Sequence, residues 1–336
     1  MYSTQVLHER AHVHHGTTLT LLRSGSSIIS RSALDSSPTA TDEASATYAP
    51  EQWWNHWIAN KATRRVAFAA FIIDSIHATM FGHSAMMVAH KMKLQLPCDE
   101  TLWSATSSAE VGRMEISLRQ KGTEPIIFFI GLKNTLDGKA VRTTSFGRTA
   151  IMAGLLSVSR HMNQQIVETH HLRALEALGG KDIWRGRLEK AFNFWKDDFD
   201  HSVGKDSIPP FMAYSSSNTD LHYLANMAMH VDVVTCQIFA KAGRLLGRTT
   251  LPSDYATAQK RIRDWAPKAS GRHATFYALK VLAQVLLPKQ PSYCFNGSVG
   301  SPYAASQDFL PAQQAMGVIL RSAHCLVLRI DFGWAR

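Results

Sequence analysis

Apolar positions recur along most of this chain with the spacing of amphipathic α-helices. Between Trp53 and Met80 they follow a 3.6-residue period without proline or glycine, and Gly82 supplies a C-terminal stop. A second clear run, from Leu221 to Leu246, keeps its apolar residues on one side and predicts one continuous helix. Similar patterns predict helices over residues 4–23, 107–122, 146–178, 183–199, 253–265 and 271–287. Because strand-like alternation with hairpin turns is absent, the sequence predicts an all-α, irregular multi-helix fold.

Polar and proline-containing stretches divide the chain into parts. Residues 24–50 are rich in Ser, Thr, Ala and Gly and contain two prolines, which predicts a flexible loop. We therefore expect an N-terminal helix over residues 1–23, this loop over 24–50, a helical domain over 51–287 and an atypical tail over 288–336. Within the domain, the Leu94–Glu100 stretch contains a proline and is too short for a helix, so we expect an extended connector.

Composition and charge narrow the function classes. The chain has 36 Lys and Arg against 26 Asp and Glu, a net charge of +10, which suits a nuclear protein or one near a polyanion. The basic residues are scattered, however, and their densest cluster, at 260–263, does not predict a nucleic-acid patch. The longest apolar runs, 66–73 and 126–130, fall far short of the ~20 residues of a membrane span. The N-terminus also lacks the apolar core of a secretory signal, so we expect an intracellular protein that does not enter a membrane.

No set of metal-binding or nucleophilic side chains stands out. The cysteines are far apart, which excludes a disulfide scaffold and a zinc finger; they are Cys98, Cys236, Cys294 and Cys325. The clustered histidines lack the glutamate-containing helical pattern of a zinc protease, so we interpret them as surface or core-edge residues; they are His12, His14, His15, His77, His83 and His90. We interpret Cys98 as structural rather than nucleophilic, because the neighbouring Asp99 would raise its pKa. We expect no catalytic residue, cofactor site or metal site in this chain.

An acidic cluster keeps one enzymatic alternative open. Asp197, Asp198 and Asp200 are similar to the acidic pairs with which all-α terpene cyclases hold magnesium-bound diphosphate. The position that would carry the next acid is His201, and no second acidic motif follows. The pattern therefore favours a solvated helix end. An all-α magnesium-dependent enzyme that uses these three acids is the alternative function, and a basic protein that grips nucleic acid directly is a third.

One constellation of residues is more specific. It consists of an arginine pair that opens a helix, an aromatic position, an aspartate that closes the apolar run, a glycine that ends the helix and a Leu-Pro connector. These signature residues are Arg64, Arg65, Phe71, Asp74, Gly82, Pro97, Cys98 and Asp99. Over roughly residues 4–287 the chain resembles the middle regulatory domain of fungal-specific transcription factors, also called the xylanolytic transcriptional activator regulatory domain. The form of the connector is most similar to the branch whose DNA reader is a zinc finger with two cysteines and two histidines.

The resemblance implies transcription regulation in the nucleus, through helix packing and without a chemical step. The zinc module that normally precedes this domain in the family is absent from the sequence, and a truncated gene model would explain its absence and the atypical tail. DNA would be contacted only through that missing module, which would also hold the only zinc. The partners it implies are the transcription machinery or co-regulators, with a homodimer or a small effector as further options.

The signature residues are assigned to packing rather than to catalysis or ligand binding. Arg64 and Arg65 stand too far from Asp74 along their helix to pair with it, so each must find partners on neighbouring helices. Asp74 lies within an apolar run and is expected to be desolvated and held by an arginine or by backbone donors from a neighbouring helix. The chain departs from the family pattern at three nearby positions, which are Ser75, His83 and Ser84.

Overall fold

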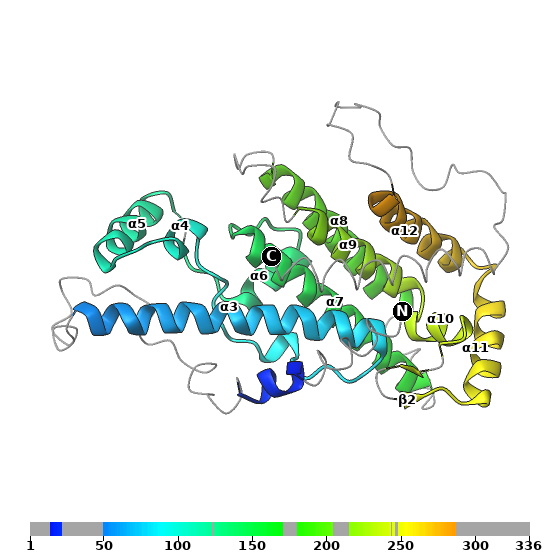
Figure 1. Ribbon diagram of the computed structural model, residues 1–336. Helices are drawn as coiled ribbons and strands as arrows, with labels where there is room; N and C mark the ends of the chain where they lie inside the picture. Colours follow the sequence, from blue (N-terminus) through cyan, green and yellow to red (C-terminus); the bar gives the residue numbers. More distant parts are fainter. Residues whose placement is uncertain are drawn as a thin grey trace. The chain divides into compact units, whose positions relative to one another are not determined.

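The computed structural model describes residues 14–21, 50–122, 124–170, 180–203, 215–242, 244–245 and 248–286. These residues are mostly helical, which confirms the predicted all-α class (Figure 1). The chain divides into two compact units, Met1–Ile208 and Pro209–Arg336. The predicted tail at 288–336, and all but the last residue of the predicted loop at 24–50, lie outside the described residues. The predicted domain boundaries therefore stay predictions.

The first unit is built around its longest described helix. α3 spans Pro50–Phe81, and its proline occupies the first turn, where the backbone N–H has no helical partner to lose. The helix ends at Gly82, whose φ of 75° lies in the left-handed region that favours glycine. The Gly82 N–H donates to the carbonyl of Ala78 at 3.0 Å. The predicted helix from Trp53 to Met80 with a glycine stop is confirmed.

Shorter helices complete this unit. They are η2 (Ala89–Lys91), α4 (Glu100–Trp103), α5 (Ser108–Gln120), α6 (Phe128–Leu136), α7 (Ser145–His170) and α8 (Gly180–Val203), and residues 14–21 are also helical. The sequence pattern does not predict α4 or α6. α4 is a single turn at the end of the connector, and the apolar run at 126–130 that leads into α6 is too brief to separate helix from strand. α8 begins at Gly180, before the predicted start at Ile183.

α7 lies in the middle of the hydrophobic core of this unit. Every residue from Thr149 to Leu156 is buried. A helix that is apolar on all sides belongs in an interior, and α7 packs against α3, α6 and α8. Although α7 is so deeply buried, neither it nor any other helix in the described part of the chain is long and apolar enough to cross a membrane.

α6 approaches α7 closely at a glycine. A Cβ atom at Gly154 would lie 2.8 Å from Cζ of Phe128 and 3.1 Å from Cδ1 of Leu132. The phenyl ring of Phe128 occupies this space and is fully buried. It also packs on Phe68 and Phe71 of α3, with ring centroids 5.6 and 5.4 Å apart. The missing side chain at position 154 therefore lets three helices share one aromatic cluster.

The Leu94–Glu100 connector is extended before it enters α4, which confirms the prediction for its first part. Leu96 donates its N–H to the carbonyl of Ile126 at 2.8 Å, and Phe128 donates its N–H to the carbonyl of Leu94 at 2.9 Å. These two bonds form an isolated antiparallel bridge that places the start of α6 beside the connector.

The second unit contains, among its described residues, four helices and one pair of very short strands. They are α9 (Ser215–His230), α10 (Val233–Phe239), β1 (Arg244–Leu245), β2 (Arg248–Thr249), α11 (Pro252–Trp265) and α12 (Ala269–Leu286). The strands pair antiparallel. α9 packs against α12, and α10 packs against α11. α11 ends at the predicted Trp265, but Leu251 rather than Ser253 is its N-cap.

The prediction of one continuous helix over residues 221–246 is wrong. α9 ends at His230, and Asp232 leaves the helical conformation, with φ −81° and ψ 105°, to cap α10. Its carboxylate accepts hydrogen bonds from the N–H of Val234 at 3.1 Å and from the hydroxyl of Thr235 at 2.6 Å. A capping aspartate offers the backbone an alternative to helix continuation. This local competition does not alter the apolar period, so periodicity alone misses the break.

Candidate functional site

Asp74 is the most enclosed polar residue of the signature. Its side chain on α3 is fully buried. The Oδ2 atom accepts a hydrogen bond of 2.8 Å from the backbone N–H of Met87. The Oδ1 atom lies 3.6 Å from Nε2 of His15 and 3.8 Å from Nε2 of His83. The expected burial and backbone donor are both present. The donor, Met87, lies in the loop of residues 82–88 that follows α3 rather than in a neighbouring helix. Histidines rather than an arginine lie beside the carboxylate.

The surroundings of Asp74 stabilise its ionised form. Burial on its own raises the pKa of the carboxyl, because it disfavours charge. Interactions with His15 and His83 and the hydrogen bond from Met87 together outweigh burial, so the pKa of Asp74 lies well below its ordinary value. Asp74 is therefore a charged tether that joins α3 to the loop of residues 82–88 and to helical residues 14–21.

Arg65 joins α3 to two other helices. Its Nη2 atom donates to both carboxylate oxygens of Glu100, at 3.0 and 3.1 Å. The guanidinium carbon lies 4.6 Å from the ring centroid of Trp103 and 5.4 Å from that of Phe146. Arginine over an aromatic ring contributes about 0.5–1 kcal/mol at exposed sites. Arg65 thus finds its partners on α4 and α7, as the sequence predicts.

Arg64, Phe71 and Gly82 also lie in structural surroundings. Arg64 is buried, and its Nη1 atom donates to the side-chain oxygen of Gln95 at 3.1 Å, which ties α3 to the connector. Phe71 is fully buried in the aromatic cluster. Gly82 provides the left-handed end of α3. Each of the three serves the packing of α3.

Pro97, Cys98 and Asp99 carry the connector into α4. Pro97 is buried, and Asp99 caps the helix by accepting bonds from the N–H of Thr101 at 2.9 Å and from its hydroxyl at 2.6 Å. Burial raises the pKa of the Cys98 thiol, and this disfavours the reactive thiolate. The structure therefore supports a structural Cys98, but the expected cause is not the one found: burial is the main cause of the raised pKa, and the neighbouring acid that adds to it is Glu100 rather than Asp99.

The interpretation of the histidines as surface or core-edge residues is wrong for His15 and His77, which are both buried. Their ring centroids lie 6.0 Å apart, and His77 packs edge-on against Phe81 at 5.7 Å. The only sequence signal for the contact between His15 and Asp74 is the position of the carboxylate within an apolar run. This position predicts that Asp74 has a partner, but it does not predict which residue the partner is. Across the described ranges, no three or more His, Cys, Asp or Glu side chains are grouped so that they could hold a metal ion.

The acidic cluster near the end of α8 does not form one site. Asp198 Oδ2 accepts a bond of 3.1 Å from Nε of Arg148, and the two side chains are 24% and 13% exposed. Asp200 is more exposed and pairs with Lys196 one turn earlier, at 2.5 Å. The solvated helix end predicted for these residues is therefore wrong for Asp198, which joins α8 to α7. Asp197 is exposed.

The Asp198–Arg148 pair should contribute measurably to stability. We expect a double-mutant cycle with Asp198→Ala and Arg148→Ala to give a coupling energy of about 1 kcal/mol, because the pair is partly desolvated and hydrogen-bonded. Urea unfolding of the parent, the two single variants and the double variant measures it. The exposed Asp200–Lys196 pair is the control, with an expected coupling of about 0.3–0.5 kcal/mol. Equal couplings for the two pairs would contradict the interhelical role of Asp198.

The residues that make these contacts lie in a part of the chain that is similar to known proteins. A family model described as "Fungal specific transcription factor domain" matches residues 1–197. The chain is 24% identical over 295 residues to the nicotinate catabolism cluster-specific transcription factor of Emericella nidulans, which covers 83% of this chain and 33% of that protein. It is also 24% identical over 277 residues to the zinc finger protein klf1 of Schizosaccharomyces pombe, covering 79% and 33%. The chain thus spans about a third of the length of these relatives. No solved structure matches it.

The matched residues include more than half of the chain and all of the signature. They contain the Asp74 tether, the contacts of Arg64 and Arg65, the glycine end of α3 and the cap of α4. The order of these parts, from the arginine pair to the Leu-Pro connector, is the order that the sequence shares with the middle regulatory domain. The chain belongs to the fungal specific transcription factor domain family.

Proposed function

We propose that this chain is the regulatory part of a fungal transcription factor and acts in the nucleus, through contacts with proteins or a small effector and without a chemical step. The match of the family model to residues 1–197 is the observation that carries the proposal. The name of klf1 as a zinc finger protein supports a zinc-containing DNA reader in the whole protein. DNA contact and any zinc would then belong to that reader.

The contacts of the candidate catalytic residues support a scaffold rather than an enzyme. Asp198 and Asp200 are engaged in two separate ion pairs, whereas a magnesium site needs oxygen ligands that converge on one point. The thiols of Cys98 and Cys236 have pKa values raised chiefly by burial, which disfavours nucleophilic attack. The comparisons with known proteins likewise supply no support for the magnesium-dependent alternative.

The basic cluster of α11 is typical of a solvated helix surface rather than of a site for specific DNA recognition. Lys260, Arg261 and Arg263 are exposed, and the Ile262 between them is buried. Three exposed cations supply a phosphate attraction that weakens steeply with salt and carries no sequence information. This supports the view that base recognition belongs to another part of the whole protein.

A reporter assay tests the proposed function. The full chain, fused to the DNA-binding domain of an unrelated protein, should change transcription of a reporter that carries the site of that domain. The DNA-binding domain alone is the baseline. Phe129→Ala, which alters an exposed side chain, should keep the effect, and Phe128→Ala, which alters the core, should reduce it. A reporter that responds equally with and without the chain would contradict the proposal.

A further inference from the structure

Most of the net positive charge of the chain lies between residues 241 and 286. This stretch contains nine Lys and Arg against two Asp and no Glu, so it carries seven of the ten net positive charges. It forms β1, β2, α11 and α12 of the second unit. On α11, the side chains of Lys260, Arg261 and Arg263 are exposed. A surface with such an excess of one sign attracts partners of the opposite sign.

α12 adds a small apolar surface to this basic stretch. The helix packs against α9, and its residues Ala274, Ala278 and Val281 are almost completely buried. Its exposed side carries Phe276 and Leu279, whose exposed fractions are 38% and 43%. A surface helix ordinarily places polar side chains outward. Because residues three positions apart are neighbours on a helix, Phe276 and Leu279 form one apolar surface.

Lys280 places a cation at the edge of this apolar surface. Its Nζ atom lies 4.9 Å from the ring centroid of Phe276 and 5.9 Å from that of Tyr223 on α9. The quadrupole of an aromatic ring attracts a cation that lies over its face, so the ammonium group stays beside Phe276 and Leu279. A carboxylate can therefore pair with Lys280 while the side chains next to that carboxylate cover the apolar pair. Phe276, Leu279 and Lys280 are together called the α12 face.

Three other occupants fit the α12 face less well. A second copy of the chain, related by a two-fold axis through this face, would bring two sets of the same cations together, and like charges repel. Residues 287–336, which follow α12, contain four Lys and Arg against two Asp, so their net charge has the same sign as the face. Single-stranded nucleic acid stacks its bases on aromatic rings, but the Lys280 ammonium already lies over the ring of Phe276. The phosphates of any nucleic acid would also give Leu279 no apolar contact.

We propose that the α12 face binds an acidic segment of a partner protein in which carboxylates alternate with apolar side chains. The apolar side chains of the segment would cover Phe276 and Leu279, and a carboxylate would pair with Lys280. The exposed cations of α11 would increase the rate at which such a segment meets the second unit. The identification of the partner as a regulatory protein rests on the function proposed above, whereas the binding of an acidic segment does not.

Fluorescence anisotropy of labelled peptides, titrated with the purified full chain, tests this surface. One probe is a peptide in which Asp alternates with Leu. The other is a peptide in which Asp alternates with Ser, so it has the same charge without the apolar side chains. We expect the Asp-Leu peptide to bind saturably and about tenfold more tightly than the Asp-Ser peptide. Its binding should weaken as the salt concentration rises, because salt screens the charges.

Two variants of the α12 face and two matched controls locate the binding site. Lys280→Glu reverses the contacting charge and Leu279→Ser removes an apolar contact, so each should weaken binding of the Asp-Leu peptide about tenfold. Both side chains reach the surface, so the fold should persist, and circular dichroism checks this. The controls, Arg119→Glu and Ile116→Ser, make the same kinds of change at exposed positions of α5. The control variants should bind the peptide like the parent.

Four results would overturn the proposal. They are the absence of saturable binding of the Asp-Leu peptide, equal binding of the two peptides, a loss of binding in the α12 variants no larger than in the α5 variants, and tighter binding of a random-sequence DNA duplex than of the Asp-Leu peptide. The last result would identify the α12 face as a nucleic-acid surface. Because the titration involves no transcription, a failed reporter assay and a failed titration are separate results, and each contradicts only its own proposal.

Discussion

Replacement of Asp74 by alanine should lower the free energy of unfolding by about 3 to 5 kcal/mol, as breaking a buried charged contact typically does. The carboxylate is fully buried, and its removal leaves the N–H of Met87 without its acceptor and His15 and His83 without the charge they face. Because a domain is stable by only about 5 to 15 kcal/mol, the loss should be plain in urea unfolding and in soluble yield.

The control for Asp74→Ala is Asp200→Ala. Asp200 is also an aspartate on a helix of the first unit, but its side chain is 56% exposed, and within the described part of the chain its ion pair is with Lys196 on the same helix. Its loss should cost less than about 0.5 kcal/mol. If the two alanine variants unfolded at the same urea concentration, the role of Asp74 as a tether would have to be abandoned.

The pH dependence of unfolding gives an independent test of the Asp74 charge. The pKa of Asp74 in the folded chain lies below the ordinary value of about 3.9 expected for the unfolded chain. The ionised carboxylate therefore stabilises the fold above that unfolded-state value, and the stabilisation is lost as the pH falls toward the folded-state pKa. Asp74→Asn keeps the size of the side chain and loses the charge. The stability gap between parent and Asp74→Asn should narrow below about pH 4.

Phe128→Ala should cost a similar amount through packing alone. The phenyl ring is fully buried between Phe68, Phe71 and the backbone at Gly154, so its removal opens a cavity among α3, α6 and α7. Truncation of a buried phenylalanine to alanine typically costs about 3 to 5 kcal/mol. Thermal and urea unfolding of the variant measure the loss.

The neighbouring residue Phe129 provides the matched control for Phe128. It lies on the same helix and is 47% exposed, so Phe129→Ala should change stability by less than about 1 kcal/mol. Equal losses for the two phenylalanines would show that α6 does not face α7 through Phe128.

Much of the first unit follows from its sequence because the signals are local. The uninterrupted period of α3, its glycine stop and the proline of the connector each act within a few residues, and each is found where expected. The burial of Asp74 was also predictable, because a charged residue in an apolar run must enter the core with the residues around it.

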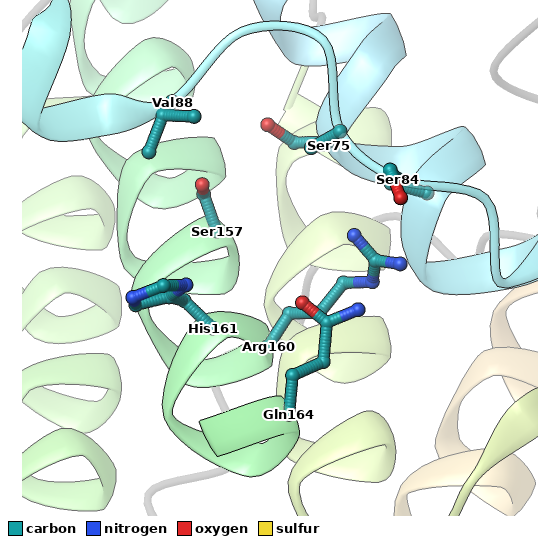
Figure 2. Close-up of a pocket in the computed structure, with 9 residues that line it drawn as sticks. Ser75, Ser84, Val88, Ser157, Arg160, His161 and Gln164 are labelled. Carbon is teal, nitrogen blue, oxygen red and sulfur yellow. The ribbon is translucent and has the colours of Figure 1, made fainter. Parts of the chain in front are cut away.

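The rest depends on contacts that sequence patterns do not encode. Histidine at position 15 meets Asp74 only after folding brings residues 14–21 to α3. The Arg148 partner of Asp198 lies on another helix. The pocket that Ser75 lines is formed where α3, the loop of residues 82–88 and α7 pack together (Figure 2). No pattern of residue types in the sequence predicts such a pocket.

The break at Asp232 makes a nested order of chain closure the less costly one in the second unit. α10 and α11 are joined by residues 240–251, whereas residues 231–268 separate α9 from α12. Closing the shorter connection costs less chain entropy. Once α10 and α11 are paired, with β1 and β2 paired between them, the ends of α9 and α12 are already drawn together, so most of the entropy for the outer pair has been lost in advance. If α9 and α10 were one continuous helix, this saving in chain entropy would be lost, because nested closure needs a bend between the helix of the inner pair, α10, and the helix of the outer pair, α9.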